Sequence, residues 1–453
     1  MPDDCPLSPS ETVTTLPSRT ENTIHGLLGD GSGGFVYRVA PSEGEERAIK
    51  LFKQSFMAID PGTPARVRRL LDMGSPSPAF AWPQEMAIHE RTESGGYSMT
   101  LVRDAVPANR LFEPSDDGRP LVGPPLDIRA RALVELARAM GSLLRRGLVI
   151  KDLSGANVLV KARTGEVAIL DTDSIDEPGR GEIFGTPGYQ AFESVAESRP
   201  QSAASDLHSL AVVAFELLTG SHPLRGQRWW QLSFPTPEDL DELFIHHPIF
   251  IFDPSDDRNR PLSPPDDPFN DCGGLASLWW WAYPCYVQEL FTSAFTSGLR
   301  EPAHRIPASK WDVVATRFLD SLAPCPQCGQ LNSIDVTWGD GPLRPCWNCE
   351  SPVVDVPHLE IGEKRVTLVP GRVVFPRRID DVSGEPRDHL LTVETHDATG
   401  DLGLKNTGLT EIEVAAPDGR TLTLAPRHVI RLASLPRGTR IRTTQGIATL
   451  VKR

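Results

Sequence analysis

The most constraining feature of this chain is the stretch VIKDLSGANVLVKARTGEVAILDTDS, residues 149–174. Two short apolar runs, VLV and VAIL, flank a Thr-Gly turn, which predicts two short strands joined tightly. An acid, Asp152, lies five residues before an amide, Asn157, and a second acid, Asp171, follows the second run. The pattern therefore predicts two carboxylates and an amide close together on one small hairpin.

A glycine-rich segment, GLLGDGSGGFVYRV, lies upstream, with Gly29, Gly31 and Gly34 in GxGxxG spacing. Glycines let backbone N–H groups approach phosphate oxygens closely. Glycine-rich hairpin turns are also common without this role, so the segment alone is weak evidence. A strand-like run, AIKLF, follows, and its Lys50 is placed to reach the phosphates of a nucleotide.

Together these residues match the needs of phosphoryl transfer. One carboxylate must accept the proton of the nucleophile, and Asp152 is the predicted base. An amide and a carboxylate must hold Mg²⁺ or Mn²⁺ against the phosphates of ATP, and Asn157 and Asp171 are the predicted ligands. A cation must fix the nucleotide, and Lys50 is the predicted cation.

The order of these motifs resembles the protein kinases from about residue 24 to residue 322. FGTPGYQAFE, residues 184–193, looks like the end of a kinase activation segment. The resemblance implies that Thr186 lies beside Asp152, as in Ser/Thr kinases. It implies an ATP-dependent enzyme that transfers the γ-phosphate to Ser or Thr of itself and of a protein partner.

Two later motifs extend the likeness into the second half of that region. SDLHSLAVVAFELLTGSHP resembles a buried kinase helix, and the resemblance implies that its acid, Asp206, braces the catalytic loop. REPAHRIPASKW resembles a late kinase motif, and the resemblance implies that Arg305 pairs with Glu193. So many motifs in one order make chance agreement a poor explanation.

The resemblance also implies an adenine pocket. Val36 and Ala48 are expected on its roof, and Leu159 on its floor. Met99 is the expected gatekeeper, and Leu101 lies in the hinge that follows it. The same side chains also suit a plain sheet core, because a kinase core and its adenine site share them.

A narrower bacterial group shares the DxDS form at residues 171–174, the AWP at residues 81–83 and the HP after the apolar helix. These kinases are found beside tellurite-resistance-type von Willebrand A proteins and metal-dependent phosphatases, and often carry a C-terminal zinc knuckle. The resemblance implies a role in a bacterial signalling or stress module. It implies a protein substrate as partner, with a von Willebrand A protein and a metal-dependent phosphatase as further candidates.

The catalytic motif departs from the usual kinase pattern at several positions. HRD is replaced by Ile150-Lys151-Asp152, which loses a structural histidine and keeps the base. Ser154 stands where a lysine is usual, which removes a cation near the transferred phosphoryl group. Thr172 replaces the Phe of DFG, as the narrower group does.

The helix glutamate that pairs with the strand lysine in active kinases is missing. Residues 51–84 contain no Glu. Asp60, Asp72 and Glu85 are candidate substitutes, and none is well placed by its spacing.

A pseudokinase that binds nucleotide without turnover is therefore the main rival hypothesis. A small-molecule kinase is a more remote one, because such kinases usually lack the GTPGY…AFE segment. The active kinase is favoured, because all four residues of the phosphoryl-transfer set are present.

Two CxxC pairs predict a metal site. CPQC and CWNC have the spacing Cx2C-x17-Cx2C, with the cysteines at Cys325, Cys328, Cys346 and Cys349. Two pairs of thiolates suit the tetrahedral coordination of a structural Zn²⁺. Disulfides and a redox CxxC are the alternatives, and a cytoplasmic chain with two copies makes both less favourable.

The last hundred residues carry an all-β pattern of short Val, Ile, Leu and Thr runs, with turns at DG and RG. A small sandwich is predicted. The spacing of its strands and turns loosely resembles that of a forkhead-associated phosphothreonine-binding domain. A generic protein-interaction sandwich is the alternative.

Composition limits the remaining choices. The formal charge of −14 argues against a nucleic-acid or membrane-surface partner. The polar start and the lack of a run of 18 apolar residues predict a cytoplasmic protein.

The expected fold class is α+β, a two-lobed kinase-like fold followed by a zinc knuckle and an all-β sandwich. The expected parts are a flexible tail (1–22), a kinase N-lobe (23–106), a C-lobe (107–322), a zinc knuckle (323–354) and the sandwich (355–453).

Overall fold

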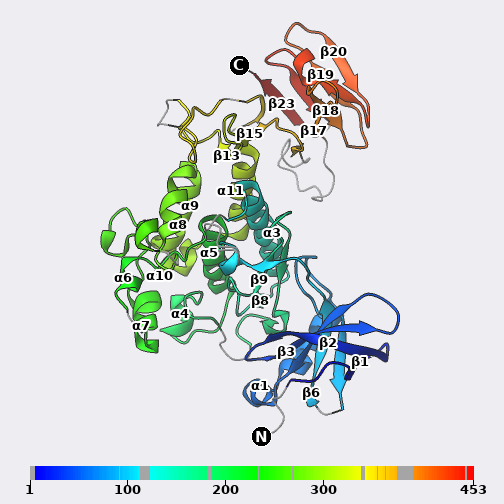
Figure 1. Cartoon of the computed structure of the whole chain (residues 1–453), viewed down its shortest axis with the longest axis vertical. Helices are drawn as coiled ribbons and strands as arrows, with labels where there is room; N and C mark the ends of the chain where they lie inside the picture. Colours follow the sequence, from blue (N-terminus) through cyan, green and yellow to red (C-terminus); the bar gives the residue numbers. More distant parts are fainter. Residues whose placement is uncertain are drawn as a thin grey trace. The chain divides into compact units, whose positions relative to one another are not determined.

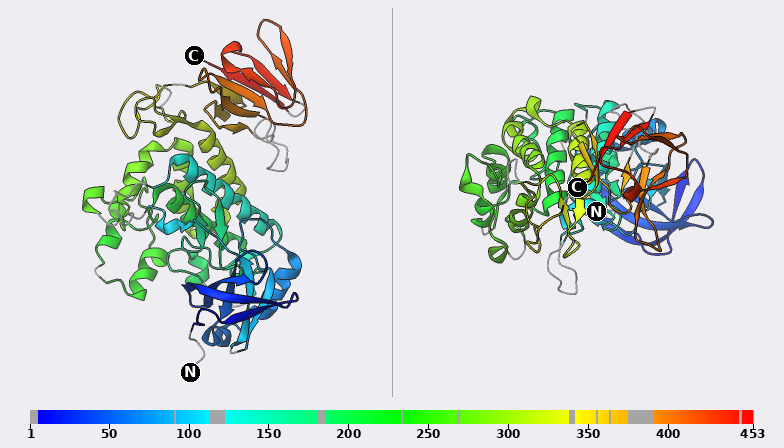
Figure 2. Two further views of the ribbon diagram at one scale, coloured as in Figure 1. Left: turned by 45° about the vertical axis from the view of Figure 1, so that its right-hand side comes forward. Right: turned by 90° about the horizontal axis from the view of Figure 1, so that it is seen from above.

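The computed structural model describes residues 6–90, 92–112, 123–180, 185–232, 234–267, 270–337, 342–354, 356–362, 364–374, 391–443 and 446–452 (Figures 1 and 2). The chain divides into two compact units. Unit 1 comprises residues 1–124, 128–280 and 288–313, and unit 2 comprises residues 125–127, 281–287 and 314–453.

Unit 1 begins with a closed barrel of six strands in the order β1-β2-β3-β4-β6-β5. Its strands are β1 (Thr12–Leu16), β2 (Thr20–Asp30), β3 (Gly34–Pro41), β4 (Arg47–Phe52), β5 (Glu85–His89) and β6 (Thr92–Thr100). The blue part of Figure 1 shows these strands gathered in one lobe of the unit. All six pairings are antiparallel.

The prediction of a flexible tail over residues 1–22 is wrong for its second half. Residues 12–16 form β1, which pairs with β2 on one side and with β5 on the other. Val13 and Thr15 are fully buried, and Thr14 between them is not. The alternation of β-branched residues in TVTTL is a strand pattern that the surrounding Ser, Thr and Pro obscured.

Alternation along the strands separates two apolar clusters. Ile49 and Leu51 of β4 face the barrel interior, where they pack with residues of β1, β2 and β3. Ala48 belongs to a second cluster on the opposite face, together with Met99. Lys50 lies on this second face too, because successive side chains of a strand point to opposite sides.

Two helices connect β4 to β5. They are α1 (Gln54–Ile59) and α2 (Thr63–Met73). Pro64 stands in the first turn of α2, where its missing N–H costs nothing. Val67 and Leu70 are buried, and Val67 belongs to the second cluster. The helix thus packs on the face of the sheet that carries Lys50.

The rest of unit 1 is mainly helical, as the cyan and green part of Figure 1 shows. Its long helices are α3 (Leu126–Arg145), α5 (Ala203–Thr219) and α9 (Cys285–Phe295), and α11 (Ala308–Ser321) begins in this unit. Shorter helices are α4 (Phe192–Val195), α6 (Gln227–Trp230), α7 (Pro237–Asp241), α8 (Gly274–Trp279) and α10 (Ser297–Arg300). Nearly all of α5 is buried, as its continuous apolar sequence predicts.

The predicted hairpin at residues 158–169 is confirmed. Strand β9 (Val158–Val160) pairs antiparallel with β10 (Val167–Ile169), and the turn between them contains Gly165 at φ +79°. Strand β7 (Val106–Pro107) completes this small sheet. A second antiparallel pair joins β8 (Val149–Ile150), which precedes the hairpin in the sequence, to β11 (Ile175–Asp176), which follows it. Residues 150–175 are thereby held as one compact loop system.

Unit 2 contains a short pair, β12 (Leu322–Pro324) with β13 (Leu331–Ser333), and two larger sheets. The six-stranded sheet has the order β15 (Lys364–Thr367), β14 (His358–Ile361), β23 (Gly446–Val451), β22 (Arg440–Thr443), β19 (Ile412–Ala415), β20 (Thr421–Leu424). The four-stranded sheet has the order β16 (Val373–Val374), β17 (Leu391–Thr395), β18 (Leu402–Asn406), β21 (Val429–Arg431). One apolar cluster contains side chains of both sheets.

Within the described part of the chain, no helix combines the length and the apolar character needed to cross a membrane.

Candidate active site

Lys50 lies at the centre of the polar groups in unit 1. In the barrel register it stands opposite Val36 on β3 and opposite Tyr97 on β6. Its residue exposure is only 6%. The Lys50 ammonium donates to Asp171 Oδ1 at 2.9 Å and to Asp173 Oδ1 at 2.8 Å. The strand lysine and the predicted metal ligand Asp171 are therefore brought together across 121 residues of sequence.

The charges of the two carboxylates hold the proton on this lysine. Burial alone would lower the pKa of the Lys50 ammonium, but Asp173 and Asp171 raise that pKa above its usual value. Burial would likewise raise the pKa of Asp173, whereas Lys50 and the Tyr97 hydroxyl lower it, and the net direction is down. Both partners of the buried pair are thus charged.

The catalytic loop places the predicted base next to two donors. Asp152 Oδ1 accepts from the Thr186 hydroxyl at 2.8 Å and from the Thr186 backbone N–H at 2.9 Å. The Asn157 side-chain amide donates to the Asp152 carbonyl at 3.0 Å. Thr186 therefore lies beside Asp152, as the resemblance implied. Asn157 is tied to the same loop and follows it directly into β9.

Asp206 of α5 fixes the backbone that precedes Asp152. One carboxylate oxygen, Oδ2, accepts the backbone N–H of Ile150 at 2.7 Å. Asp206 is 1% exposed, and burial raises its pKa well above the usual value, although the bond from Ile150 opposes this. The predicted position of Asp206 against the catalytic loop is confirmed.

The end of the activation segment is anchored by a buried fork. Arg305 Nη1 and Nη2 donate to Glu193 Oε1 and Oε2, each at 2.6 Å. Both side chains are nearly inaccessible to solvent. This is the pairing that the resemblance implied for Arg305 and Glu193. Such a two-bond arrangement fixes orientation as well as distance.

The glycine-rich hairpin between β2 and β3 has two kinds of glycine. A Cβ on Gly34 would lie 2.3 Å from the Leu51 carbonyl oxygen, so no side chain fits there. A Cβ on Gly29 would meet nothing within 4 Å, and one on Gly31 only the Gly34 oxygen at 3.8 Å. A Cβ on Gly33, which the sequence motif does not include, would lie 3.6 Å from Lys50 Nζ. The hairpin tip therefore lies over Lys50.

The predicted adenine-pocket residues lie in one apolar cluster and along one cavity, and Leu101 belongs to both. Ala48, Met99, Val36 and Leu101 belong to one apolar cluster on the Lys50 face of the barrel. Leu159 and Leu101 line a cavity of about 310 Å³ that runs along the hinge. Leu170, which directly precedes Asp171, packs against the same cluster as Val36.

The three candidates for the missing helix acid were wrong. Asp60 pairs with Arg66 of α2 at 2.7 Å, and Glu85 pairs with Arg47 at 3.1 Å. Asp72 lies near the end of α2, and no described contact joins it to Lys50. The second acid at Lys50 is Asp173, which lies outside residues 51–84. Its signal was the D-x-D spacing immediately after a strand.

The departures in the catalytic loop also have visible consequences. The Lys151 ammonium donates to the Arg180 carbonyl, so it meets the activation-segment backbone. Burial lowers the pKa of Lys151, and the neighbouring Arg66 lowers it further. Ser154 is 1% exposed, and so it is a buried small residue where a long cation is usual.

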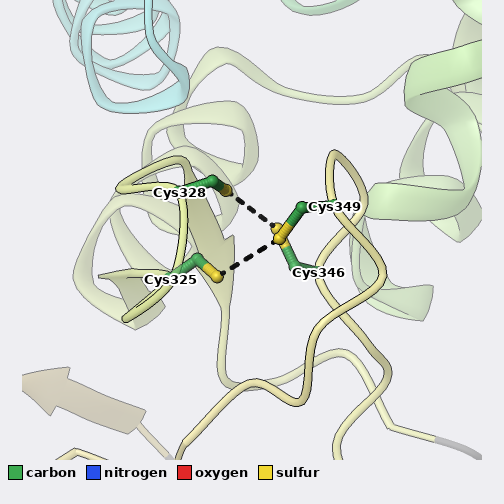
Figure 3. Close-up of side chains that lie close together, drawn as sticks. All are labelled: Cys325, Cys328, Cys346 and Cys349. Atoms are coloured by element: carbon green, nitrogen blue, oxygen red, sulfur yellow. Dashed lines mark hydrogen bonds between the residues drawn. The ribbon is translucent and has the colours of Figure 1, made fainter.

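The four predicted zinc ligands of unit 2 lie together. Figure 3 shows Cys325 and Cys328 on one turn and Cys346 and Cys349 on another. All four sulfur atoms lie within 4.8 Å of one another. The Cys325–Cys349 and Cys328–Cys346 sulfur separations are 3.7 and 3.6 Å, and none of the four is in a disulfide.

This arrangement fits a tetrahedral zinc ion. Zn–S bonds of about 2.3 Å in a tetrahedron separate the sulfurs by about 3.8 Å. The chemistry also fits, because thiolates are the ligands that zinc prefers in structural sites. Hydrogen bonds from the side chain and backbone of Ser351 lower the pKa of the Cys349 thiol to about 6.

Comparison with known proteins agrees with this site. Residues 23–234 match the protein kinase domain family. Serine/threonine-protein kinase PkaA of Streptomyces coelicolor is 32% identical over 220 residues, which are 44% of this chain and 39% of the relative. Serine/threonine-protein kinase PkaB of the same organism is 29% identical over 219 residues, 45% and 50% of the two chains. Serine/threonine-protein kinase PknA of Mycobacterium tuberculosis is 28% identical over 214 residues, 44% and 47% of the two chains.

The alignments cover half or less of each of these relatives. The family match at residues 23–234 includes the glycine-rich hairpin, Lys50 and the catalytic loop. Residues 23–234 are therefore similar to the kinase domains of bacterial Ser/Thr protein kinases, and this region has mixed helix and sheet content.

Proposed function

We propose that this protein is an ATP-dependent Ser/Thr kinase that phosphorylates itself and a protein partner. One observation carries the proposal. Asp152 is held by Thr186 and Asn157, and Lys50 is held by Asp171, in a domain similar to Ser/Thr protein kinases. These are the base, the metal ligands and the cation that phosphoryl transfer needs.

Asp152 is proposed to take the proton of the attacking hydroxyl. Its Oδ1 already accepts the Thr186 hydroxyl at 2.8 Å, so the position beside it suits a Ser or Thr hydroxyl. Two donors from Thr186 hold this carboxylate in a fixed orientation. General-base catalysis of this kind contributes about 10²- to 10⁴-fold to the rate.

Asn157 and Asp171 suit an Mg²⁺ or Mn²⁺ ion. The Asn157 amide nitrogen donates to Asp152, which leaves the amide oxygen as the coordinating atom. The Asp171 side chain is 42% exposed, and its oxygen ligands are of the kind that Mg²⁺ prefers. When bound, the ion supplies charge that neutralises the phosphates.

ATP itself is proposed to lie between the hairpin and the hinge. Lys50 orients the phosphates under the hairpin tip, where Gly29 and Gly31 leave space. The apolar cluster that contains Ala48 and Met99 would cover the adenine base.

The pseudokinase alternative is not favoured. All four phosphoryl-transfer residues are present, and the similar proteins are Ser/Thr protein kinases. The buried acid Asp173 also binds Lys50, which answers the main sequence argument for inactivity, the missing helix glutamate.

For unit 2 we propose a structural zinc site and a protein-interaction domain. Four cysteines occupy all positions of a tetrahedron, so this zinc would stabilise folding. The two sheets with a shared apolar cluster support a small sandwich. Its likeness to a forkhead-associated domain, and a von Willebrand A protein and a metal-dependent phosphatase as partners, stay predictions from sequence.

Labelled phosphate transfer tests the kinase proposal. Purified chain, Mg²⁺ and γ-labelled ATP are combined with and without a generic acceptor protein, followed by phosphoamino-acid analysis. We expect label on serine or threonine, and its loss in Asp152→Asn and in Asp171→Asn. Asp397→Asn, an exposed acid of unit 2, is the matched control and should label like the wild type. Equal labelling by Asp152→Asn would contradict the proposal.

A further inference from the structure

The turn after β10 directs two carboxylates at one ammonium. Asp171 has φ +52°, a left-handed conformation, and a single helical turn, η2 (Thr172–Ser174), follows. The Thr172 hydroxyl donates to the Ala81 carbonyl at 3.1 Å, which pins the middle of the turn. Asp171 and Asp173, two residues apart, consequently both reach Lys50 Nζ.

The two carboxylates differ in their access to solvent. The Asp171 side chain is 42% exposed, whereas that of Asp173 is 6% exposed. The exposed acid is available to a metal ion. The buried acid uses Oδ1 to accept both Lys50 and the Tyr97 hydroxyl, the latter at 2.8 Å. Because Asp173 is buried and its Oδ1 is already bound to Lys50 and Tyr97, it suits the role of a fixed partner of the lysine.

Asp173 is also held through its backbone. Arg66 Nε of α2 donates to the Asp173 carbonyl at 2.5 Å. Arg66 is itself fixed by Asp60 at 2.7 Å and by Thr63 at 3.0 Å. Helix α2 therefore contributes the cation Arg66, which binds the Asp173 carbonyl, whereas the corresponding helix of active kinases contributes a glutamate that binds the lysine. It contacts the turn, and the turn contacts Lys50.

We infer that Asp173 is the positioning residue for Lys50 and takes the part that a helix glutamate plays in other kinases. The inference rests on the proposed function and deepens it. Because Asp171 and Asp173 share one turn, the metal ligand and the lysine partner are set by the same piece of backbone. The lysine–acid pair then depends on the turn and Tyr97, with α2 acting through Arg66.

ATP kinetics of the full chain test this role. Asp173→Asn should lower kcat/KM for ATP at least about 100-fold, because a misplaced cation costs about this much. The Mg²⁺ concentration dependence of the remaining activity should stay that of the wild type. Asp267→Asn is the matched control, because Asp267 is 3% exposed and binds only nearby backbone N–H groups among its described contacts.

A second readout needs no turnover. In NMR spectra of [15N]lysine-labelled chain without nucleotide, the Lys50 ammonium signal should change in Asp173→Asn, because the ammonium loses its buried charged partner at 2.8 Å. The Lys50→Arg chain assigns the signal. This measurement separates the two proposals, because a changed Lys50 signal in a chain that transfers no phosphate would keep the pairing and contradict the kinase function.

Three results would overturn the inference. One is wild-type ATP kinetics in Asp173→Asn. Another is a changed Mg²⁺ requirement in that variant, which would make Asp173 a metal ligand. If Asp173→Asn does not fold, Tyr97→Phe decides, since it removes one donor to Asp173 and should lower kcat/KM about tenfold. The third result is unchanged kinetics in Tyr97→Phe, which would then assign Asp173 a structural role only.

Discussion

Around Lys50 in unit 1, a buried ammonium is matched by two carboxylates of the same chain. The cysteine cluster of unit 2 instead gathers four groups that each become negative on losing a proton. The first site balances its charges with residues that the chain already holds. The second reaches balance only with a cation from outside.

This difference separates two ways of building a site. The polar groups of unit 1 are positioned by hydrogen bonds and ion pairs between residues of the chain itself. The thiols repel one another once they are ionised, so their turns are tied to metal binding. The predictions below test each side of the comparison, from the largest expected effect to the smallest.

Removal of one thiol should have the largest effect. Cys346→Ser should reduce bound zinc from one equivalent per chain to almost none, and unit 2 should lose stability on the order of 10 kcal/mol. Metal analysis and calorimetry measure the two effects. Cys285→Ser, an exposed free cysteine outside the cluster, should change neither. A full zinc equivalent in Cys346→Ser would show that the cluster is not the metal site.

Breaking an internal ion pair should cost less. Glu193→Gln leaves the buried Arg305 with a neutral partner, and the free energy of unfolding in urea should fall by about 3–5 kcal/mol. Asp256→Asn disrupts an exposed pair with Arg258 and should have no measurable effect. Equal losses in both variants would mean that burial does not distinguish the pairs.

The same pair predicts a pH dependence. Burial would raise the Glu193 pKa, but Arg305 lowers it, and the net direction is down. The unfolded chain therefore binds this proton more readily than the folded one. The stabilisation is present above the usual glutamate pKa and is lost as the pH falls through the lowered value. Urea midpoints of wild type and Glu193→Gln should converge in acid, and a constant gap would contradict this.

A single hydrogen bond at the base should have a smaller effect, seen in the rate. Thr186→Val removes the hydroxyl that bonds Asp152, and kcat should fall about 10- to 100-fold, as expected for a bond to a charged acceptor. Thr186→Ser keeps the hydroxyl and should stay near the wild-type rate. If Ser and Val fall alike, the methyl group and not the hydroxyl is what matters.

The smallest effect belongs to a pair with one exposed member. Arg69→Ala removes the partner of Asp176, yet solvent at the half-exposed Arg69 limits the loss of stability to about 1 kcal/mol. Arg68→Ala, the exposed neighbour on α2, should be neutral. A loss of 3 kcal/mol or more, as estimated for fully buried pairs, would place this pair with Glu193–Arg305.

Local patterns accounted for much of the fold. The apolar run of α5 predicted a buried helix, and the Thr-Gly turn predicted the β9–β10 hairpin. Strand β1 was missed, because five residues of TVTTL look like a polar tail unless their partners β2 and β5 are known. Edge closure of a barrel is a long-range event that no local pattern contains.

The candidate site divides in the same way. Asp152 and Asn157 could be found because their spacing lies within one loop. Asp173 was not found, although it lies two residues from Asp171. Its role depends on a left-handed turn, on Tyr97 from another strand and on Arg66 from α2.

The sequence by itself determined which donors and acceptors this protein carries and their order along the chain. It also determined the four thiols in two tight turns, since local backbone geometry sets each pair. Only the tertiary structure decided which acid meets Lys50. The reason is that a buried ammonium needs a carboxylate at contact distance, and packing over 123 residues of separation selects the one that can be buried with it.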